Sequence, residues 1–292
     1  MRVWVRPVLG LVVALVGGSV ASTAAHASVG VIGQLDRHHV LDPNGTVRGE
    51  VWVENTHDEP VVVTAALADY WQHRHRDQWP AAPSHPRSLA PFIRFQPAEQ
   101  TVPADSRRRV SFVIDLSANA DGQDPSALSG TYWAALMIRP EPVWAPTVTG
   151  PGQPLHLRER FQTAVRLSVT LTTPASAELV FAQAQWQRGE QVKDSDQSRD
   201  VLWLELHNTG QRLLDLDVVG EWVAGQGASL ERTALGRVQI YPGGRRRLRW
   251  PLHHRPKAVH EALVVATPTE RMLTPQRFGA RFVFDAEAHP RP

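Results

Sequence analysis

Short stretches in which apolar and polar residues alternate recur along this chain, and they limit its fold more than any other feature. Residues two apart lie on the same face of a β-strand, so this period predicts strands with one buried face. The 23 prolines argue against long helices. We therefore expect an all-β protein. The most regular stretch places these residues on one face: Phe161, Thr163, Val165, Leu167, Val169 and Leu171.

Other predicted strands are separated by clusters of turn-forming residues. In residues 47–53 the alternation places Val51 and Val53 on one face and Trp52 on the other. Short strands with turn signals between them are typical of a β-sandwich. The remaining predicted strands cover residues 61–71, 109–116, 131–138 and 213–223.

The N-terminal segment has the pattern of a secretory signal peptide. Arg2 and Arg6 precede an apolar run over residues 8–20, and Ala25-His26-Ala27 supplies the small residues of a cleavage site. The run is shorter than the roughly 20 residues that cross a membrane. We expect residues 1–27 to be removed. The mature protein is then periplasmic or secreted and not an integral membrane protein.

Charge and composition limit the function classes. Removing Arg2 and Arg6 from the 31 basic residues leaves 29, which equals the 29 acidic residues. A nucleic-acid-binding protein needs a basic excess on one face, so we expect no nucleic-acid partner. The chain has no cysteine, which excludes disulfides and thiol catalysis.

Catalytic motifs are also missing from the sequence. It contains no Gly-x-Ser-x-Gly, His-Glu-x-x-His or phosphate-binding loop. We therefore expect a protein that is not an enzyme and has no cofactor or metal. The nearest candidate metal ligands are His73, His75 and His85; the alternative interpretation is an exposed polar loop.

A weak internal repeat predicts two similar domains. An apolar strand ends at Asn55-Thr56, and residues 103–112 later run from a turn through three arginines into an alternating strand. Asn208-Thr209 and residues 242–250 repeat this order. Two copies of one sandwich module explain the repeat, and coincidence of common turn chemistry is the alternative. We interpret the arginines as solvated charges at strand starts.

A linker predicted at residues 172–177 divides the chain. We expect an N-terminal immunoglobulin-like domain over residues 28–173 and a C-terminal immunoglobulin-like domain over residues 178–287.

The order of motifs in the first half resembles the N-terminal domain of periplasmic pilus-assembly chaperones. Residues 35–37 open the first strands, and residues 162–167 (Gln-Thr-Ala-Val-Arg-Leu) precede Pro174 in the manner of the last strand of that domain, strand G. Residues 87–94 are similar to a divergent bacterial group of the family. The resemblance covers about residues 28–174 and is looser over residues 178–287.

The resemblance implies a chaperone for a secreted, pilin-like β subunit, with an outer-membrane usher as a second partner. Such a chaperone lends an edge strand to a subunit that lacks its last strand. Arg166 then anchors the terminal carboxylate of the subunit through a charge-assisted bond. Arg37 is the best candidate for a second basic anchor, and His38 or His39 are the alternatives for that position.

By the same resemblance, the donor strand carries Leu155, Leu157, Phe161 and Val165, which share one parity. Glu159 interrupts the series where the family places an apolar residue. An ordinary sandwich strand explains the alternation as well. In that interpretation the protein is a structural or adhesive module of the cell envelope. An accessible sheet edge at this strand distinguishes the two.

Overall fold

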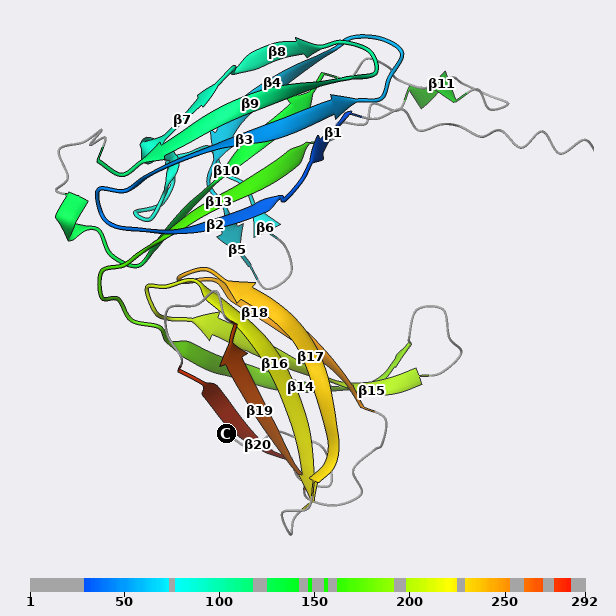
Figure 1. The fold of residues 1–292 in the computed structure, drawn as a ribbon. Helices are drawn as coiled ribbons and strands as arrows, with labels where there is room; N and C mark the ends of the chain where they lie inside the picture. The colour runs from blue at the N-terminus through cyan, green and yellow to red at the C-terminus, as the bar shows by residue number, and fades with distance from the viewer. Residues whose placement is uncertain are drawn as a thin grey trace, which may run out of the picture.

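The computed structural model describes most of the chain as two β-sandwiches, which lie one above the other in Figure 1. The predicted fold class, two tandem immunoglobulin-like β-sandwich domains, is confirmed. None of the helices in this part of the chain is long and apolar enough to cross a membrane. The expected signal peptide, residues 1–27, lies outside the described residues. The described residues are 29–73, 77–117, 125–141, 147–148, 155–156, 162–191, 198–224, 229–252, 260–269 and 276–284.

The first sandwich combines a four-stranded sheet, β1-β3-β9-β7, with a five-stranded sheet, β2-β13-β10-β4-β8. Consecutive strands β1 and β2 belong to different sheets, so the chain crosses from one sheet to the other between them. The ladder between β2 and β13 is parallel, whereas the other ladders are antiparallel. The strands are β1 (Val29–Ile32), β2 (Asp36–Leu41), β3 (Thr46–Asn55), β4 (Val61–Ala68), β7 (Ile93–Gln96), β8 (Glu99–Val102), β9 (Ser106–Asp115), β10 (Thr131–Pro140) and β13 (Thr163–Leu171).

Short elements extend from this sandwich. Two hairpins of two-residue strands pair β5 with β6 and β11 with β12. The elements are β5 (Trp71–Gln72), β6 (Asp77–Gln78), β11 (Thr147–Val148), β12 (Leu155–His156) and the 3₁₀ helices η1 (Ala90–Phe92) and η2 (Pro125–Ala127).

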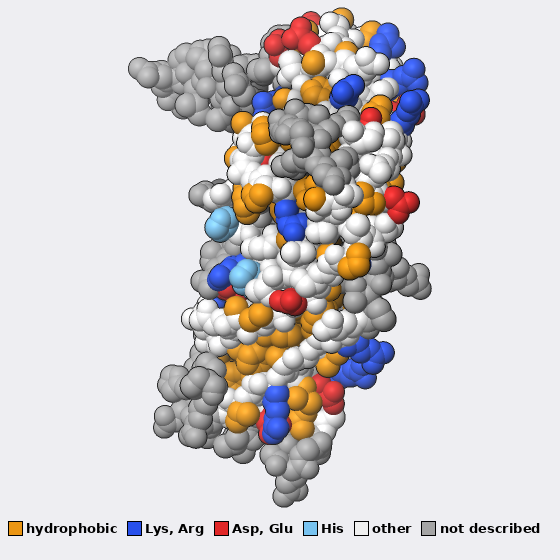
Figure 2. All heavy atoms as spheres, turned by 90° about the vertical axis from the view of Figure 1, so that its left-hand side faces the viewer, with side chains coloured by type: hydrophobic (Ala, Val, Ile, Leu, Met, Phe, Trp, Pro, Cys, Tyr) orange, Lys and Arg blue, Asp and Glu red, His pale blue; other side chains and the backbone are white. Residues whose placement is uncertain are grey.

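The second sandwich combines sheet β14-β15-β18 with sheet β17-β16-β19-β20. Figure 2 shows apolar side chains gathered on this domain. The edge strands β14 and β20 contribute Phe181 and Phe282, which are partly buried and whose rings lie 6.5 Å apart. The strands are β14 (Leu179–Gln191), β15 (Ser198–Asn208), β16 (Leu214–Ala224), β17 (Ser229–Ile240), β18 (Arg245–Leu252), β19 (His260–Pro268) and β20 (Phe278–Phe284).

The alternating pattern of the sequence determines which side chains enter the core. In β3, Val51 and Val53 are fully buried while Trp52 is 40% exposed, as predicted. Gly49 of the same strand faces Phe112 of β9, and a Cβ at this glycine would lie 2.4 Å from the aromatic ring. The ring therefore requires a residue without a side chain at that position.

The repeated asparagine performs the same task in both domains. Asn55 at the end of β3 is fully buried; its Nδ2 donates to the carbonyls of Glu59 (2.8 Å), Val102 (3.1 Å) and Pro103 (3.1 Å). Asn208 at the end of β15 is equally buried, and its Nδ2 donates to two carbonyl oxygens. Each amide thus fixes two turns that would otherwise leave buried carbonyls unbonded. This equivalence supports the interpretation of two copies of one module.

Replacing Asn55 with alanine should lower the free energy of unfolding by about 2–3 kcal/mol, because buried carbonyl groups lose their donor. Urea denaturation followed by circular dichroism measures the change. Asn44→Ala, at an exposed turn residue, is the matched control and should cost less than about 0.5 kcal/mol. Equal losses in the two variants would contradict this structural role of Asn55.

Candidate functional site

The segment between the domains is held by hydrogen bonds to the second sandwich. Ser176 O accepts from the backbone N–H of Gln211 (2.9 Å) and of Arg212 (3.2 Å). The Arg212 side chain donates to Thr173 O at 2.9 Å, and the backbone N–H of Thr131 in β10 donates to Gln211 O at 2.8 Å. The bond between Thr131 and Gln211 joins the two sandwiches directly, and the other three fix the connecting segment to the second sandwich.

A single buried amide, Gln72 of β5, connects the first sandwich to the turn between β17 and β18. Its Oε1 accepts from the backbone N–H of Tyr241 at 2.8 Å, and its Nε2 donates to Gln239 O at 3.1 Å. Tyr241 packs against Tyr70 and Trp133 of the first sandwich, with ring centroids 5.5 Å and 5.0 Å apart. An apolar cluster with hydrogen bonds inside it therefore crosses the domain boundary.

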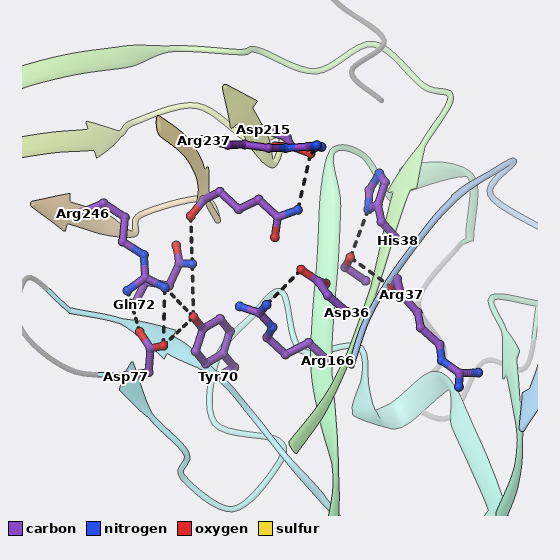
Figure 3. Close-up of polar contacts among 12 residues, drawn as sticks. Asp36, Arg37, His38, Tyr70, Gln72, Asp77, Arg166, Asp215, Arg237 and Arg246 are labelled. Carbon is purple, nitrogen blue, oxygen red and sulfur yellow. Dashed lines mark hydrogen bonds and ion pairs between the residues drawn. The ribbon is translucent and has the colours of Figure 1, made fainter. Parts of the chain in front are cut away.

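Three guanidinium–carboxylate pairs surround this contact, as Figure 3 shows. They involve the pairs Arg166–Asp36 (3.0 Å), Arg246–Asp77 (2.7 Å) and Arg237–Asp215. The first pair belongs to the first sandwich, the third to the second sandwich, and the middle pair joins the two. We call these six residues, with Tyr70 and Gln72, the interdomain cleft.

Arg166 of β13 points toward the second sandwich. Its strand neighbours Val165 and Leu167 are fully buried in the first core, so the opposite face of β13 carries the Arg166 side chain. The guanidinium lies over the ring of Tyr70 at 5.7 Å and is about 29% exposed. It is thus a partly desolvated cation within the cleft.

Burial and neighbouring charges shift the pKa values of three side chains in the cleft. Burial lowers the pKa of Arg166, but the nearby Asp36 carboxylate raises it, and the net effect is a raised pKa. Burial raises the pKa of Asp215, yet the hydrogen bonds and the charge of Arg237 outweigh burial and leave this pKa lowered. Burial raises the pKa of the Tyr70 hydroxyl. These groups are therefore held in their ordinary charge states at neutral pH.

Tyr70 and Arg246 connect the charges to the aromatic cluster. The Tyr70 hydroxyl donates to Asp77 Oδ2 at 2.9 Å and accepts from Arg246 Nη2 at 2.7 Å. The middle arginine of the second triplet is therefore a bonded interdomain residue. This corrects the interpretation of that arginine as a solvated charge, because its position on β18 directs it to the first sandwich.

Arg37 does not join Arg166, which corrects the expected basic pair. Residue 37 is opposite Leu167 in the parallel ladder, whereas Asp36 is opposite Arg166. The Arg37 guanidinium lies over the ring of Phe112, 5.6 Å from its centroid, and its Nε donates to Gln34 O at 3.3 Å. Figure 3 shows the two arginine side chains pointing apart. Adjacent strand residues leave the sheet on opposite faces, and this rule excludes the pair.

His38 is one of the two alternatives that were named for the second basic anchor. It shares a face of β2 with Asp36, and its Nδ1 lies 3.0 Å from Ser168 Oγ on β13. Ser168 is two residues beyond Arg166 and lies on the same face. Of the two alternatives, His38 and His39, the register thus brings His38 to the face of Arg166.

Two of the four predicted donor-strand residues belong to described strands. Val165 is fully buried in the first core. Leu155 belongs to β12 and pairs with Val148 of β11. Leu157 and Phe161 lie outside the described residues.

The histidine-rich segment has a buried member. His85 stacks on Trp133 at 4.5 Å and lies edge-on to Trp71 at 4.9 Å. Its Nε2 is 3.7 Å from a carboxylate oxygen of buried Asp69. This corrects the interpretation of His85 as part of an exposed loop; His73 is exposed and His75 is not described. Within the described ranges, no three potential ligands meet to form a metal site.

Sequence reasoning missed the residues that form the interface. Gln72 and Asp77 lie in a proline-rich segment without a regular pattern, so no periodicity indicated their contacts. Gly130 was a usable signal: its φ is +75°, and a Cβ there would lie 2.2 Å from Gln211 O. A glycine directly before a predicted strand indicates such a close approach of backbones.

Comparison with known proteins gives structural similarity only. No family model matches the chain, and no curated protein matches it. A chain of the chaperone–tip adhesin complex of CFA/I fimbriae biogenesis is similar at 8% identity and a TM-score of 0.46, over 87% of this chain and 98% of that one.

Two further chaperone structures are similar as well. A chain of the Salmonella enterica complex of SafA pilin with the SafB chaperone has 14% identity and a TM-score of 0.41, over 87% of this chain and 96% of that one. The E. coli chaperone DraB has 15% identity and a TM-score of 0.38, over 87% and 98%. At these identities the likeness of these structures to this chain concerns the fold alone.

Asp215→Asn should lower the free energy of unfolding at pH 7 by about 1–3 kcal/mol, because Arg237 loses a charged hydrogen-bond partner. A carboxyl whose pKa is lowered in the folded state stabilises the protein above its unfolded pKa of about 4. The deficit should therefore shrink as the pH falls through the lowered pKa of Asp215.

Urea denaturation at pH 7 and at successive pH values below 4 measures the deficit. Asp58→Asn, at an exposed turn, is the control and should show little change at any pH. A deficit of equal size at neutral and acidic pH would contradict the assignment of the effect to the ionised carboxylate.

Proposed function

We propose that this protein is a periplasmic chaperone-like protein that binds secreted β subunits lacking one strand. In this proposal it lends the edge of β13 to the subunit and anchors the terminal carboxylate of the subunit at Arg166. The observation that carries the proposal is that the ladder between β2 and β13 begins only at Arg166, the residue that faces the cleft. An outer-membrane usher is proposed as the second partner, by the family resemblance of the sequence.

The strand pairing of β13 changes at Arg166. On one side, β10 pairs with β13 from Thr163 to Thr170. On the other side, the ladder with β2 begins only at Arg166, whose backbone N–H donates to Leu35 O at 2.7 Å. Among the described strands, Thr163 to Val165 therefore have a ladder partner on one side only. An unpaired strand edge is a template for an added strand.

The position of Arg166 fits the end of such an added strand. A partner strand along Thr163 to Val165 with its last residue at the start of the β2 ladder would bring its carboxylate beside the Arg166 guanidinium. That strand would run in the same direction as β13. A partly desolvated guanidinium with several N–H donors is well suited to bind a carboxylate.

A structural or adhesive envelope module is the second candidate, and two observations favour it. Arg166 already forms an ion pair with Asp36, so its charge is balanced without a partner protein. The Val165 side chain is also buried in the core of its own domain. In a purely structural protein, both contacts would serve the fold alone.

Capture of a partner tests the proposal. The tagged protein, purified from the periplasm of its own host, should carry a small β subunit in a one-to-one complex that mass spectrometry identifies. Arg166→Ala should reduce capture by about tenfold or more, because the carboxylate loses a charge-assisted bond. Its stability should change by less than about 1 kcal/mol, since the lost ion pair is partly exposed.

Arg107→Ala is the matched control. It removes another arginine of the first sandwich that forms an ion pair, with Glu54 at 2.7 Å, on the other sheet. This variant should capture the subunit as the wild type does. Unchanged capture by Arg166→Ala would overturn the anchor, and co-purification of surface-layer components alone would favour the structural module.

A further inference from the structure

The cation of the cleft that is best placed to bind a carboxylate already binds one. Arg166 Nη2 donates to Asp36 Oδ2 at 3.0 Å, and this is the hydrogen bond that joins the two side chains. Asp36 comes from β2, directly opposite Arg166 in the parallel ladder. The Asp36 carboxylate thus occupies an N–H group that an incoming carboxylate could otherwise bind.

The cleft as a whole offers no excess positive charge among its described residues. Its three arginines each face one aspartate, at distances of 3.0 Å for Arg166–Asp36 and 2.7 Å for Arg246–Asp77, and in direct contact for Arg237–Asp215. A further carboxylate would enter an electrically balanced site. It would be repelled by Asp36 if both shared the Arg166 guanidinium, because like charges a few ångströms apart oppose each other.

The two other carboxylates of the cleft are fixed by the fold more firmly than Asp36. Asp77 is 31% exposed but is bound by Tyr70 within the first domain and by Arg246 across the domain boundary, and the Asp215 side chain is only 4% exposed. The Asp36 side chain is 23% exposed, and β2 is an edge strand of its sheet. A change at Asp36 therefore alters the charge beside Arg166 with the least disturbance of the core.

We propose that Asp36 is a built-in competitor that sets the affinity of the cleft for a carboxylate-terminated partner strand. The inference rests on the proposed function, because it concerns the same anchor. Partner binding exchanges one carboxylate for another on Arg166, so the net gain is the difference between two similar bonds. The cleft then binds a carboxylate end only when the rest of the partner strand also contributes.

The test compares two synthetic peptides. Both alternate valine and threonine after two N-terminal lysines; one ends in a free carboxylate and the other in an amide. Isothermal titration calorimetry measures their dissociation constants with the mature chain and with Asp36→Asn, which preserves the shape of the side chain. Asp36→Asn should bind the carboxylate peptide at least about fivefold more tightly than the wild type does. The amide peptide should bind equally to both proteins.

Glu54→Gln is the matched control, because it removes one negative charge that faces Arg107 on the other sheet. It should leave both affinities unchanged. The proposal is overturned if Asp36→Asn binds the carboxylate peptide no more tightly than the wild type does, including no binding at all, or if the amide peptide gains equally. Thermal denaturation verifies that Asp36→Asn is folded.

The outcomes separate this inference from the proposed function. If Arg166→Ala loses its native partner while Asp36→Asn shows no gain, the anchor stands and the competitor role fails. If the wild type captures no β subunit but Asp36→Asn gains affinity for the carboxylate peptide, Asp36 limits the affinity of the cleft for a carboxylate, and the chaperone function fails.

Discussion

The contact of Gln72 with the β17–β18 turn is the interaction on which the rest of the cleft depends. One amide accepts from Tyr241 N–H and donates to Gln239 O, in the way that a strand pairs with its neighbour. Both partner groups are backbone atoms of the second sandwich. The two hydrogen bonds therefore fix the position of this backbone relative to β5. Without it, the buried N–H of Tyr241 and the partly buried carbonyl of Gln239 would lose this partner at a domain boundary, which is costly.

The charges of the cleft acquire their arrangement from this contact. Tyr70 stands beside Gln72, carries Arg166 over its ring and binds Arg246 through its hydroxyl. A hinge between the domains would separate Arg246 from Asp77 and expose the aromatic cluster to water. Relative motion is the usual expectation for tandem domains unless the interface is large and apolar. Here the aromatic cluster and the bonded connecting segment oppose such motion.

Much of the fold followed from the sequence, because period-two alternation reflects burial directly. The alternation of residues 163–171 predicted β13 and the outward face of Arg166, and the repeated Asn-Thr pairs indicated equivalent turns. The site was less predictable. The assignment of Arg37 was wrong because it depends on the exact register of a parallel ladder. Gln72 and Asp77 act across a domain boundary from an irregular segment, and no local pattern encodes such contacts.

The measurement that tests this account most directly is the distance between the two sandwiches in solution. The chain has no cysteine. Replacing two exposed residues, Arg94 of β7 and Val180 of β14, with cysteine therefore introduces the sole spin-label sites. Pulsed electron paramagnetic resonance should give one narrow distance distribution, which broadens when Gln72→Ala is added. A broad distribution in the chain with intact Gln72 would contradict the claim that this contact fixes the cleft.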